Sequence, residues 1–457
     1  MAEIEYLKGL KAVRERAHLV LEAATQDNLT HFSYYPDLMP GVADFVAGII
    51  NRDFGPNRFQ EIPPHGRWQH FDIGGVPRVD KLIKGWQSAG HDETEITRRL
   101  IDLFFVAVLL DAGAGDFWKF TEPDTGNEYG RSEGIAVAAL YMFKAGTFSD
   151  GGAGEGGGNK NEAVDGNIGH GLVSLDIAEF RKHFQITANN EIISDISRVS
   201  LLQSVGHSLL NLPEIFGDKG DLEISWVGFH LLDSSSSVYS SFDLDYLLAN
   251  RKDGGNLNYE VLWSVLQKTL LPAWPKNRTH VSGVPIGDAW PLQTLKRLNS
   301  DQQTQDGALN IQPFHKLTQW LAYSLSVPFI RVLGLGWDNI DQGTGLPEYR
   351  NGGLFVDLGV LKLKGNVLKE GQRNSGQETP SFDATSDVIV EWRSMTVALL
   401  DTLHKLIADR FALQGVRISM AQMLEAGTWK GGRELAAKYR PETKSSPIVI
   451  QGDGTLF

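Results

Sequence analysis

The sequence contains no cysteine among its 457 residues. This absence excludes a disulfide framework, a metal site with cysteine ligands and a cysteine nucleophile. Positive charge is also scarce, because 43 Lys and Arg stand against 56 Asp and Glu and give a formal net charge of −13. Nucleic-acid binding and docking on anionic membranes both need clustered basic residues. The charge balance therefore argues against both kinds of partner.

Long apolar runs are absent as well. The most apolar stretch, residues 100–114, carries Asp102 and Asp111 and ends among glycines. It is too short and too charged for a membrane span and predicts a buried core helix. Residues 1–27 are charged and lack the short apolar run of a signal peptide. We therefore expect a soluble, cytoplasmic protein.

The motifs of several enzyme classes are missing from the chain. There is no Gly-x-x-x-x-Gly-Lys-Ser/Thr phosphate loop and no Gly-x-Ser-x-Gly nucleophile elbow. The Gly-x-Gly at 113–115 follows a helical pattern instead of a strand and has no third glycine at the required spacing. A dinucleotide-binding loop is therefore not indicated.

Helical spacing of apolar residues dominates what remains. Helices are predicted at 3–25, 41–51, 78–88, 94–114, 133–145, 176–184, 196–210, 257–270, 313–326, 386–412 and 418–427. Glycine and proline in 343–364 predict strands or turns. Since no βαβ alternation or repeat is seen, we predict a mainly α fold over 1–457, as a single large helical unit with a few short strands. We further predict a glycine-rich mobile insertion at 151–165 and an extended tail at 440–457.

Charged residues near helix ends are the first chemical candidates. Asp111 lies near the end of the helix predicted at 94–114, where burial costs free energy unless the carboxylate is paired. A solvent-facing or capping role fits it equally well. Arg131 and Glu133 stand at the start of the helix predicted at 133–145 and fit a helix cap with an acid in the first turn.

Two histidines and a carboxylate share one loop bounded by proline and glycine. His65, His70 and Asp72 are residue types that bind metals. No His-Glu-x-x-His spacing accompanies them. A polar loop that packs Trp68 and lines a pocket is therefore favoured. A metal-dependent amidohydrolase that uses these three residues stays as an alternative.

Two further charged clusters are ambiguous on their own. Glu348 and Arg350 lie in the glycine-rich segment, and Glu391 and Arg393 lie in the helix predicted at 386–412. Exposed ion pairs of this kind contribute little stability. In an enclosed pocket, a carboxylate can serve as a base or stabilise an oxocarbenium ion. The residues alone thus indicate an acidic helical protein in which carboxylate chemistry is one option.

Four strings resemble the uracil catabolism protein 4 family of fungi and bacteria, and the likeness covers essentially the whole chain. They are His-Gly-Arg-Trp-Gln-His-Phe-Asp at 65–72, Leu-Leu-Asp-Ala-Gly-Ala-Gly at 109–115, Arg-Ser-Glu-Gly-Ile-Ala-Val-Ala at 131–138 and Gly-Leu-Pro-Glu-Tyr-Arg at 345–350. The resemblance implies a role in a uracil-degrading route that passes through ribosylurea and ends in urea and a three-carbon acid. The step it suggests is hydrolysis of the N-glycosidic bond of ribosylurea or its 5′-phosphate.

A more distant likeness is to the queuosine salvage proteins, which are N-glycosidases related in fold to DNA glycosylases. Three motifs occur in the order found in that family: Asp111-Ala112 before Phe117-Trp118, Glu348-Tyr349-Arg350 before Asp357-Leu-Gly-Val-Leu361, and Glu391-Trp392-Arg393. The resemblance implies a helical fold of that type. It also implies a catalytic carboxylate at Glu348, where this chain has Glu in place of the family's Asp.

These resemblances suggest roles for particular residues. Glu348 would stabilise an oxocarbenium-like transition state and activate water, and Asp111 would donate a proton or bind urea. Arg350 or Arg393 would hold a 5′-phosphate. The other predicted substrate-binding residues are Tyr349, Trp118, Arg131, Glu133, His70, Asp72 and Glu391. The expected partner is a small ribosylurea-like nucleoside or nucleotide, with no cofactor and no metal. A non-catalytic pathway scaffold stays as a further alternative.

Overall fold

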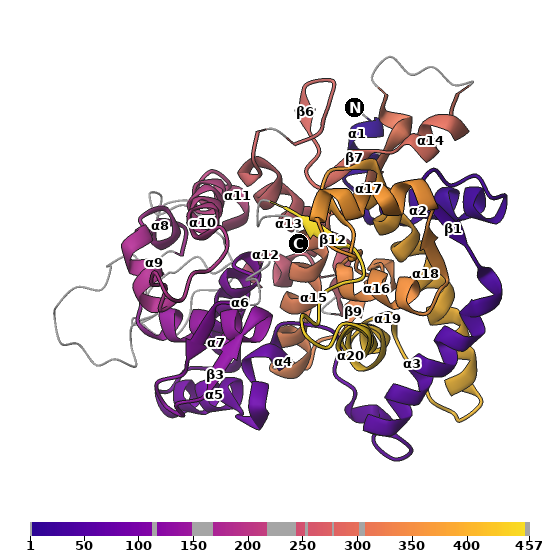
Figure 1. Cartoon of the computed structure of the whole chain (residues 1–457). Coiled ribbons are helices and arrows are strands. Elements are labelled where there is room, and N and C mark those ends of the chain that lie inside the picture. Colours follow the sequence, from indigo (N-terminus) through magenta and orange to yellow (C-terminus); the bar gives the residue numbers. More distant parts are fainter. Residues whose placement is uncertain are drawn as a thin grey trace. The chain divides into compact units, whose positions relative to one another are not determined.

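The computed structural model of the chain describes residues 2–111, 117–148, 168–216, 244–251, 255–276, 278–300 and 307–452 (Figure 1). Within these ranges the protein is mainly helical, and its short strands pair only two at a time. The predicted fold class is therefore confirmed. The insertion predicted at 151–165 lies outside the described residues, and so do residues 453–457 of the predicted tail. A likeness in fold to the queuosine salvage proteins stays a prediction.

The chain forms two compact units, each assembled from segments that are distant in the sequence. Unit 1 comprises residues 1–65, 275–323 and 340–457, and unit 2 comprises residues 66–274 and 324–339. The prediction of one catalytic unit over 1–457 stays a prediction. None of the helices in the described ranges is long and apolar enough to cross a membrane.

Unit 1 is built around a long buried helix, α18 (Asp387–Ala412), which contacts α2 (Leu10–Thr25), α3 (Met39–Phe54) and α16 (Tyr349–Asp357). The side chains from Val388 to Asp401 are all buried, as expected of a helix that is covered on every side. The other helices and turns are α1 (Ala2–Leu7), η1 (Pro36–Leu38), η2 (Phe59–Glu61), α14 (Gln293–Leu298), η5 (Ala308–Asn310), the first part of α15 (Lys316–Arg331), η6 (Ile340–Gln342), α17 (Gly365–Ser375), α19 (Met420–Met423), the π-helical turn η7 (Leu424–Thr428) and α20 (Trp429–Tyr439).

The strands of unit 1 form four separate pairs. The antiparallel pairs are β1 (Phe32–Tyr34) with β10 (Leu361–Leu363), β5 (His280–Val281) with β6 (Val284–Pro285), and β7 (Ala289–Pro291) with β8 (Ile311–Pro313). The parallel pair joins β11 (Ser381–Asp383) to β12 (Val449–Gln451), so the chain near its C-terminal end is extended against unit 1.

The region 343–364 was predicted to be strand-like or turn-rich, and it does contain β10, but the prediction was wrong for its centre, where α16 lies. Its glycines allow close helix packing. A Cβ at Gly352 would lie 2.9 Å from the ring of Trp392 on α18. On the facing helix α20, a Cβ at Gly432 would lie 2.2 Å from the backbone oxygen of Arg350. These glycines therefore let α16 approach α18 and α20.

Unit 2 centres on the apolar helix α6 (Glu93–Leu109), whose N-cap Asp92 accepts a hydrogen bond from Glu95 N. It packs against α7 (Arg131–Lys144). The helix ends at Leu109, earlier than predicted, and Asp111 follows it. The remaining elements are α4 (Trp68–Phe71), η3 (Ile73–Gly75), α5 (Arg78–Ser88), β2 (Lys119–Thr121), β3 (Glu128–Gly130), α8 (Ile168–Val173), α9 (Ile177–His183), α10 (Asp195–Leu210), α11 (Pro213–Phe216), α12 (Leu244–Ala249), β4 (Leu257–Asn258), α13 (Tyr259–Leu270), η4 (Leu271–Ala273), the last part of α15 and β9 (Trp337–Asp338).

Candidate functional site

The predicted site residues divide between the two units. Unit 1 contains Glu348, Tyr349, Arg350, Glu391 and Arg393, and unit 2 contains the others. The two groups are described separately below.

Glu348 is the N-cap of α16, and both of its carboxylate oxygens are engaged. Oε1 accepts a hydrogen bond from Asn351 N at 2.6 Å and Oε2 accepts one from Arg350 N at 2.7 Å. The side chain is partly buried, and burial raises the pKa of Glu348 above its ordinary value. The two N–H groups and the charges of Lys316 and Arg350 act in the opposite direction. The result is a carboxylate held in one orientation at a helix N-terminus.

Asn351 connects this carboxylate to the π-helical turn η7. Its backbone N–H binds Glu348, and its side-chain Oδ1 accepts a hydrogen bond from Thr428 Oγ1 at 2.8 Å. Within the same turn, Glu425 Oε2 lies 2.6 Å from Nδ1 of the buried His65. Single π-helical turns are rare and occur frequently at functional sites. The carboxylate of Glu348 and the His65–Glu425 pair therefore belong to one hydrogen-bonded region of unit 1.

The aromatic surroundings of this region come from two helices. The His65 ring centroid lies 4.6 Å from that of Trp320 on α15 and 6.3 Å from that of Trp429 on α20. Arg433 lies over the Trp429 ring, with its guanidinium carbon 4.7 Å from the centroid. The sequence prediction placed His65 in a polar loop, with a metal site as the alternative, and it did not identify Trp320 or Glu425.

Arg350 and Tyr349 pack against each other. The guanidinium carbon of Arg350 lies 4.9 Å from the Tyr349 ring centroid, and its Nη1 donates a hydrogen bond to Lys444 O at 3.0 Å. Arg350 is 6% exposed. This hydrogen bond therefore connects Arg350, on α16, to the segment that follows α20. Whether either residue contacts a substrate stays a prediction.

Glu391 and Arg393, from the third motif, make structural contacts. Glu391 is fully buried and accepts hydrogen bonds from Thr30 N, His31 N and Thr294 Oγ1. Arg393 forms a bidentate ion pair with the buried Asp288, with N···O distances of 2.8 and 2.7 Å.

The Arg393–Asp288 pair also reaches the Glu348 loop. Arg393 Nε donates a hydrogen bond to Pro347 O at 3.4 Å, and Asp288 accepts one from Lys316 N at 3.0 Å. The Arg393 side chain therefore supports the residue that precedes Glu348. A phosphate contact of Arg393 stays a prediction.

In unit 2, Asp111 is part of a buried charged cluster. Its Oδ2 lies 2.9 Å from Arg67 Nη1, and the same Nη1 lies 2.9 Å from His70 Nδ1. Arg67 Nη2 donates to Ala107 O at 2.9 Å. The Asp111 side chain is 9% exposed, and its buried Oδ1 has no hydrogen-bond partner within the described part of the chain. Two of the predicted residues, Asp111 and His70, are thus brought together by Arg67, which the prediction had not identified.

Two more residues border this cluster. Arg198 on α10 donates hydrogen bonds to the backbone oxygens of Leu110 and Ile193. Burial lowers the pKa of Arg198, while the charge of Asp111 opposes the shift. Glu133, in the first turn of α7 as predicted, is buried and interacts electrostatically with Arg67. The cluster therefore combines two arginines with two carboxylates.

The other predicted residues of unit 2 lie in different surroundings. Asp72 accepts a hydrogen bond from Val79 N at 3.1 Å in the first turn of α5, and burial raises its pKa. Trp118 is fully buried and donates from Nε1 to Phe184 O at 2.9 Å. Arg131 is the first residue of α7 and has a positive φ of 54°.

The metal alternative lacks a suitable geometry. Within the described ranges, no group of three His, Asp or Glu side chains is placed so that it could hold a metal ion. His65 pairs with Glu425, and His70 pairs with Arg67. A metal-dependent amidohydrolase built on His65, His70 and Asp72 is therefore not supported.

Comparison with known proteins adds to this geometry. The model of the family described as "Protein of unknown function (DUF1688)" matches residues 6–457. Protein urg3 of Schizosaccharomyces pombe is 41% identical over 452 residues, which cover 99% of this chain and 98% of that protein. Uracil catabolism protein 4 of Lachancea kluyveri is 39% identical over 468 residues, which cover 99% of each chain.

Proposed function

The chain belongs to the DUF1688 family, and on this basis we propose that it acts in uracil catabolism and hydrolyses the bond between urea and ribose in ribosylurea or its 5′-phosphate. The pathway part rests on a relative named for uracil catabolism that matches nearly the full length of this chain. The chemical part rests on the carboxylate of Glu348 and on the resemblance to N-glycosidases described above.

The observation that carries the proposed chemistry is the fixed, partly buried Glu348. Hydrolysis of an N-riboside passes through an oxocarbenium-like transition state, in which positive charge develops at the anomeric carbon and the ring oxygen. A carboxylate that is already oriented stabilises that charge without reorganisation. Two backbone N–H groups give Glu348 this orientation. Burial raises its pKa, which makes the carboxylate a stronger base towards water.

The reaction balances with water as the only co-substrate. The bond between the anomeric carbon and the urea nitrogen breaks, and its electron pair goes to nitrogen. The oxygen of water bonds to the anomeric carbon while Glu348 accepts a proton from that water. The departing nitrogen takes up one proton from solvent water, and the protonated Glu348 afterwards releases its proton to solvent, so the products are urea and ribose or its phosphate.

Other residues of unit 1 have positioning roles in this proposal. Arg393 fixes Pro347, and Thr428 fixes Asn351, on either side of the carboxylate along the chain. Glu425 lies in the same turn as Thr428, and its hydrogen bond with His65 holds that turn. No role in this step is assigned to Asp111, and its predicted function as an acid or a urea-binding group stays a prediction.

The test is to incubate the purified protein with ribosylurea and with its 5′-phosphate and to measure urea and free sugar. Glu348→Gln removes the charge and keeps one oxygen that can accept one of the two α16 hydrogen bonds, while its NH2 group faces the other backbone N–H. We expect kcat to fall by about a hundredfold or more, and the loss of one cap hydrogen bond to lower the free energy of unfolding by about 1 kcal/mol, which leaves the protein folded at the assay temperature. Glu348→Asp retains the carboxylate one methylene further back, so we expect activity between those of the wild type and Glu348→Gln.

A matched control is Asp92→Asn, which removes the charge of another N-cap carboxylate, on α6. This variant should turn over substrate at the wild-type rate. Near-normal release of urea by Glu348→Gln would refute the assignment of Glu348. Ammonia in place of urea would indicate an amidohydrolase, and no turnover by the wild type on either compound would indicate a scaffold.

A further inference from the structure

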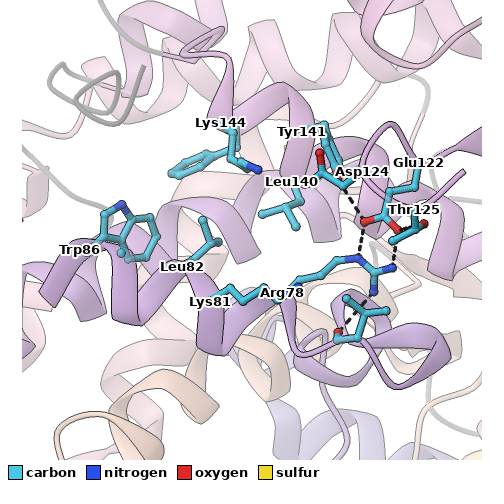
Figure 2. Close-up of a pocket in the computed structure, with 13 residues that line it drawn as sticks. Arg78, Lys81, Leu82, Trp86, Glu122, Asp124, Thr125, Leu140, Tyr141 and Lys144 are labelled. Atoms are coloured by element: carbon cyan, nitrogen blue, oxygen red, sulfur yellow. Dashed lines mark hydrogen bonds and ion pairs between the residues drawn. The ribbon is translucent and has the colours of Figure 1, made fainter. Parts of the chain in front are cut away.

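A pocket of about 290 Å³ lies in unit 2 between α5, α7 and the turn that joins β2 to β3 (Figure 2). None of the residues predicted from the sequence as catalytic or substrate-binding lines it. Side chains from α5 and α7 form most of its wall, and the turn adds polar groups.

One wall of the pocket is formed by an ion pair whose two charges neutralise each other. Arg78 donates from Nε and Nη2 to the two oxygens of Glu122, each at 2.7 Å, and both side chains are buried. Glu122 also accepts a hydrogen bond from Thr125 Oγ1 at 2.6 Å. The charges of Arg78 and Glu122 cancel, so this pair makes the wall rigid without attracting an ion.

Two lysines supply the positive charge that remains. Lys81 and Lys144 line the pocket from α5 and α7, and Figure 2 shows both at its edges. Neither forms an ion pair within the described part of the chain, although Lys144 Nζ lies 4.9 Å from the centroid of the Tyr141 ring. Asp124 contributes one negative charge and is hydrogen-bonded with Tyr141. The free charges therefore sum to one positive charge, in a chain whose net charge is −13.

The space between the lysines is apolar and aromatic. Leu82 and Leu140 lie there in Figure 2, and the buried indole of Trp86 closes one end. Phe143 adds a second ring to the lining. Small-molecule sites typically combine an apolar lining with a few polar groups that fix orientation. Apolar and aromatic walls favour an apolar or aromatic body, and the two ammonium groups favour an acidic group at its edge.

We propose that this pocket binds a small organic monoanion, namely an aromatic or heteroaromatic ring that bears one carboxylate. The ring lies against Trp86, Leu82 and Leu140, and the carboxylate faces Lys81 and Lys144. Ribosylurea has no apolar ring, so this ligand is distinct from the proposed substrate. The proposal therefore does not depend on the proposed hydrolysis.

The first experiment titrates the full-length protein with indole-3-acetate and with its neutral analogue indole-3-acetamide, using calorimetry or ligand-observed NMR. We expect saturable binding of the acetate at one site and binding of the amide that is about fivefold weaker, which is the effect of one solvent-exposed ion pair. Equal affinities for the two compounds would overturn the role of the lysines. No saturable binding of either compound would overturn the site.

A charge-removal series then locates the binding. The double variant Lys81→Gln and Lys144→Gln should weaken the binding of indole-3-acetate about fivefold or more. It should leave the affinity for indole-3-acetamide unchanged. Lys84→Gln is the matched control, because Lys84 is an exposed lysine of α5 that does not line the pocket. Glu348→Gln should bind the acetate as the wild type does. A loss of affinity in Lys84→Gln equal to that of the double variant would refute the assignment to this pocket.

Discussion

At the scale of single residues, Glu348 and Glu391 are similar carboxylates that differ in how deeply they are buried. Each accepts hydrogen bonds from two backbone N–H groups. Glu391 is fully buried and also accepts a hydrogen bond from Thr294 Oγ1, so its surroundings are complete without a ligand. Glu348 is partly exposed, and its pKa is raised. Of the two, Glu348 is therefore the better candidate for chemistry.

The resemblance named Glu348 as a candidate, but it did not name the residues that hold its carboxylate and its loop. Thr428 is 77 positions from its partner Asn351, and Glu425 is 360 positions from His65. No local periodicity connects residues at such separations. The only available signals were the residue types themselves, which occur in many other places in the chain. For the same reason Arg67, the partner of Asp111, could not be predicted.

Glu122 gives a prediction for stability. Replacing it with Gln leaves the Arg78 guanidinium buried without its counter-charge, so we expect a loss of about 3 kcal/mol in the free energy of unfolding at neutral pH. The ion pair lowers the pKa of Glu122 from 4.5 to about 2. Because the pKa of Glu122 is lower in the folded protein than in the unfolded chain, the ionised carboxylate stabilises the fold at pH values above about 4.5. This stabilisation is lost as the pH falls from about 4.5 towards about 2.

Chemical denaturation at neutral and at acidic pH measures this effect. The difference between the wild type and Glu122→Gln should be constant near neutral pH and smaller in acid. Glu61→Gln is the control, because Glu61 is an exposed partner of Arg58 at 3.7 Å and should change stability by less than about 0.5 kcal/mol. Equal effects of the two variants would contradict the prediction.

At the scale of elements, periodicity predicted the amphipathic helices well. The helix expected at 78–88 is α5, and the one expected at 386–412 is α18 to within one residue. Helix α16 was missed because its glycines resemble those of turns. In the structure, these glycines allow close packing against α18 and α20, which is a tertiary contact and leaves no local pattern. The π-helical turn η7 was likewise not distinguishable from an α-helix in the sequence.

The packing of α20 on α16 gives the prediction at this scale. Gly432→Ala places a methyl group 2.2 Å from the backbone oxygen of Arg350, two residues after Glu348. Since Gly432 and Arg350 both belong to helices, the clash can be relieved only if α16 and α20 move apart. We expect a loss of stability of about 1–3 kcal/mol and a fall in kcat larger than the fall in melting temperature would explain.

The control for this variant is Gly48→Ala on α3, where nothing lies within 4 Å of the added Cβ. Alanine favours the helix there, so this variant should be as stable as the wild type or more stable by up to about 1 kcal/mol. Thermal unfolding and the urea-release assay measure both variants. Gly432→Ala behaving like Gly48→Ala would show that α16 does not depend on this contact.

At the scale of the whole molecule, the absence of cysteine is the firmest constraint. Because the sequence has no thiol, we expect maleimide treatment to leave turnover and melting temperature unchanged, and reducing agents to have no effect. Assays before and after treatment test this. Inactivation would mean that the reagent modifies an amine, which mass spectrometry would locate.

The sequence by itself determined the helical class, the acidic charge and the absence of thiol chemistry, which are properties of composition and of local periodicity. The candidate carboxylates came from the resemblance of short motifs to known families. Only the tertiary structure decided which residues hold those carboxylates, the close packing of α16 and the pocket beside Trp86, because each depends on contacts between distant segments. It also divided the chain into two units whose boundaries have no compositional signature, since units of this kind are defined by contacts in space.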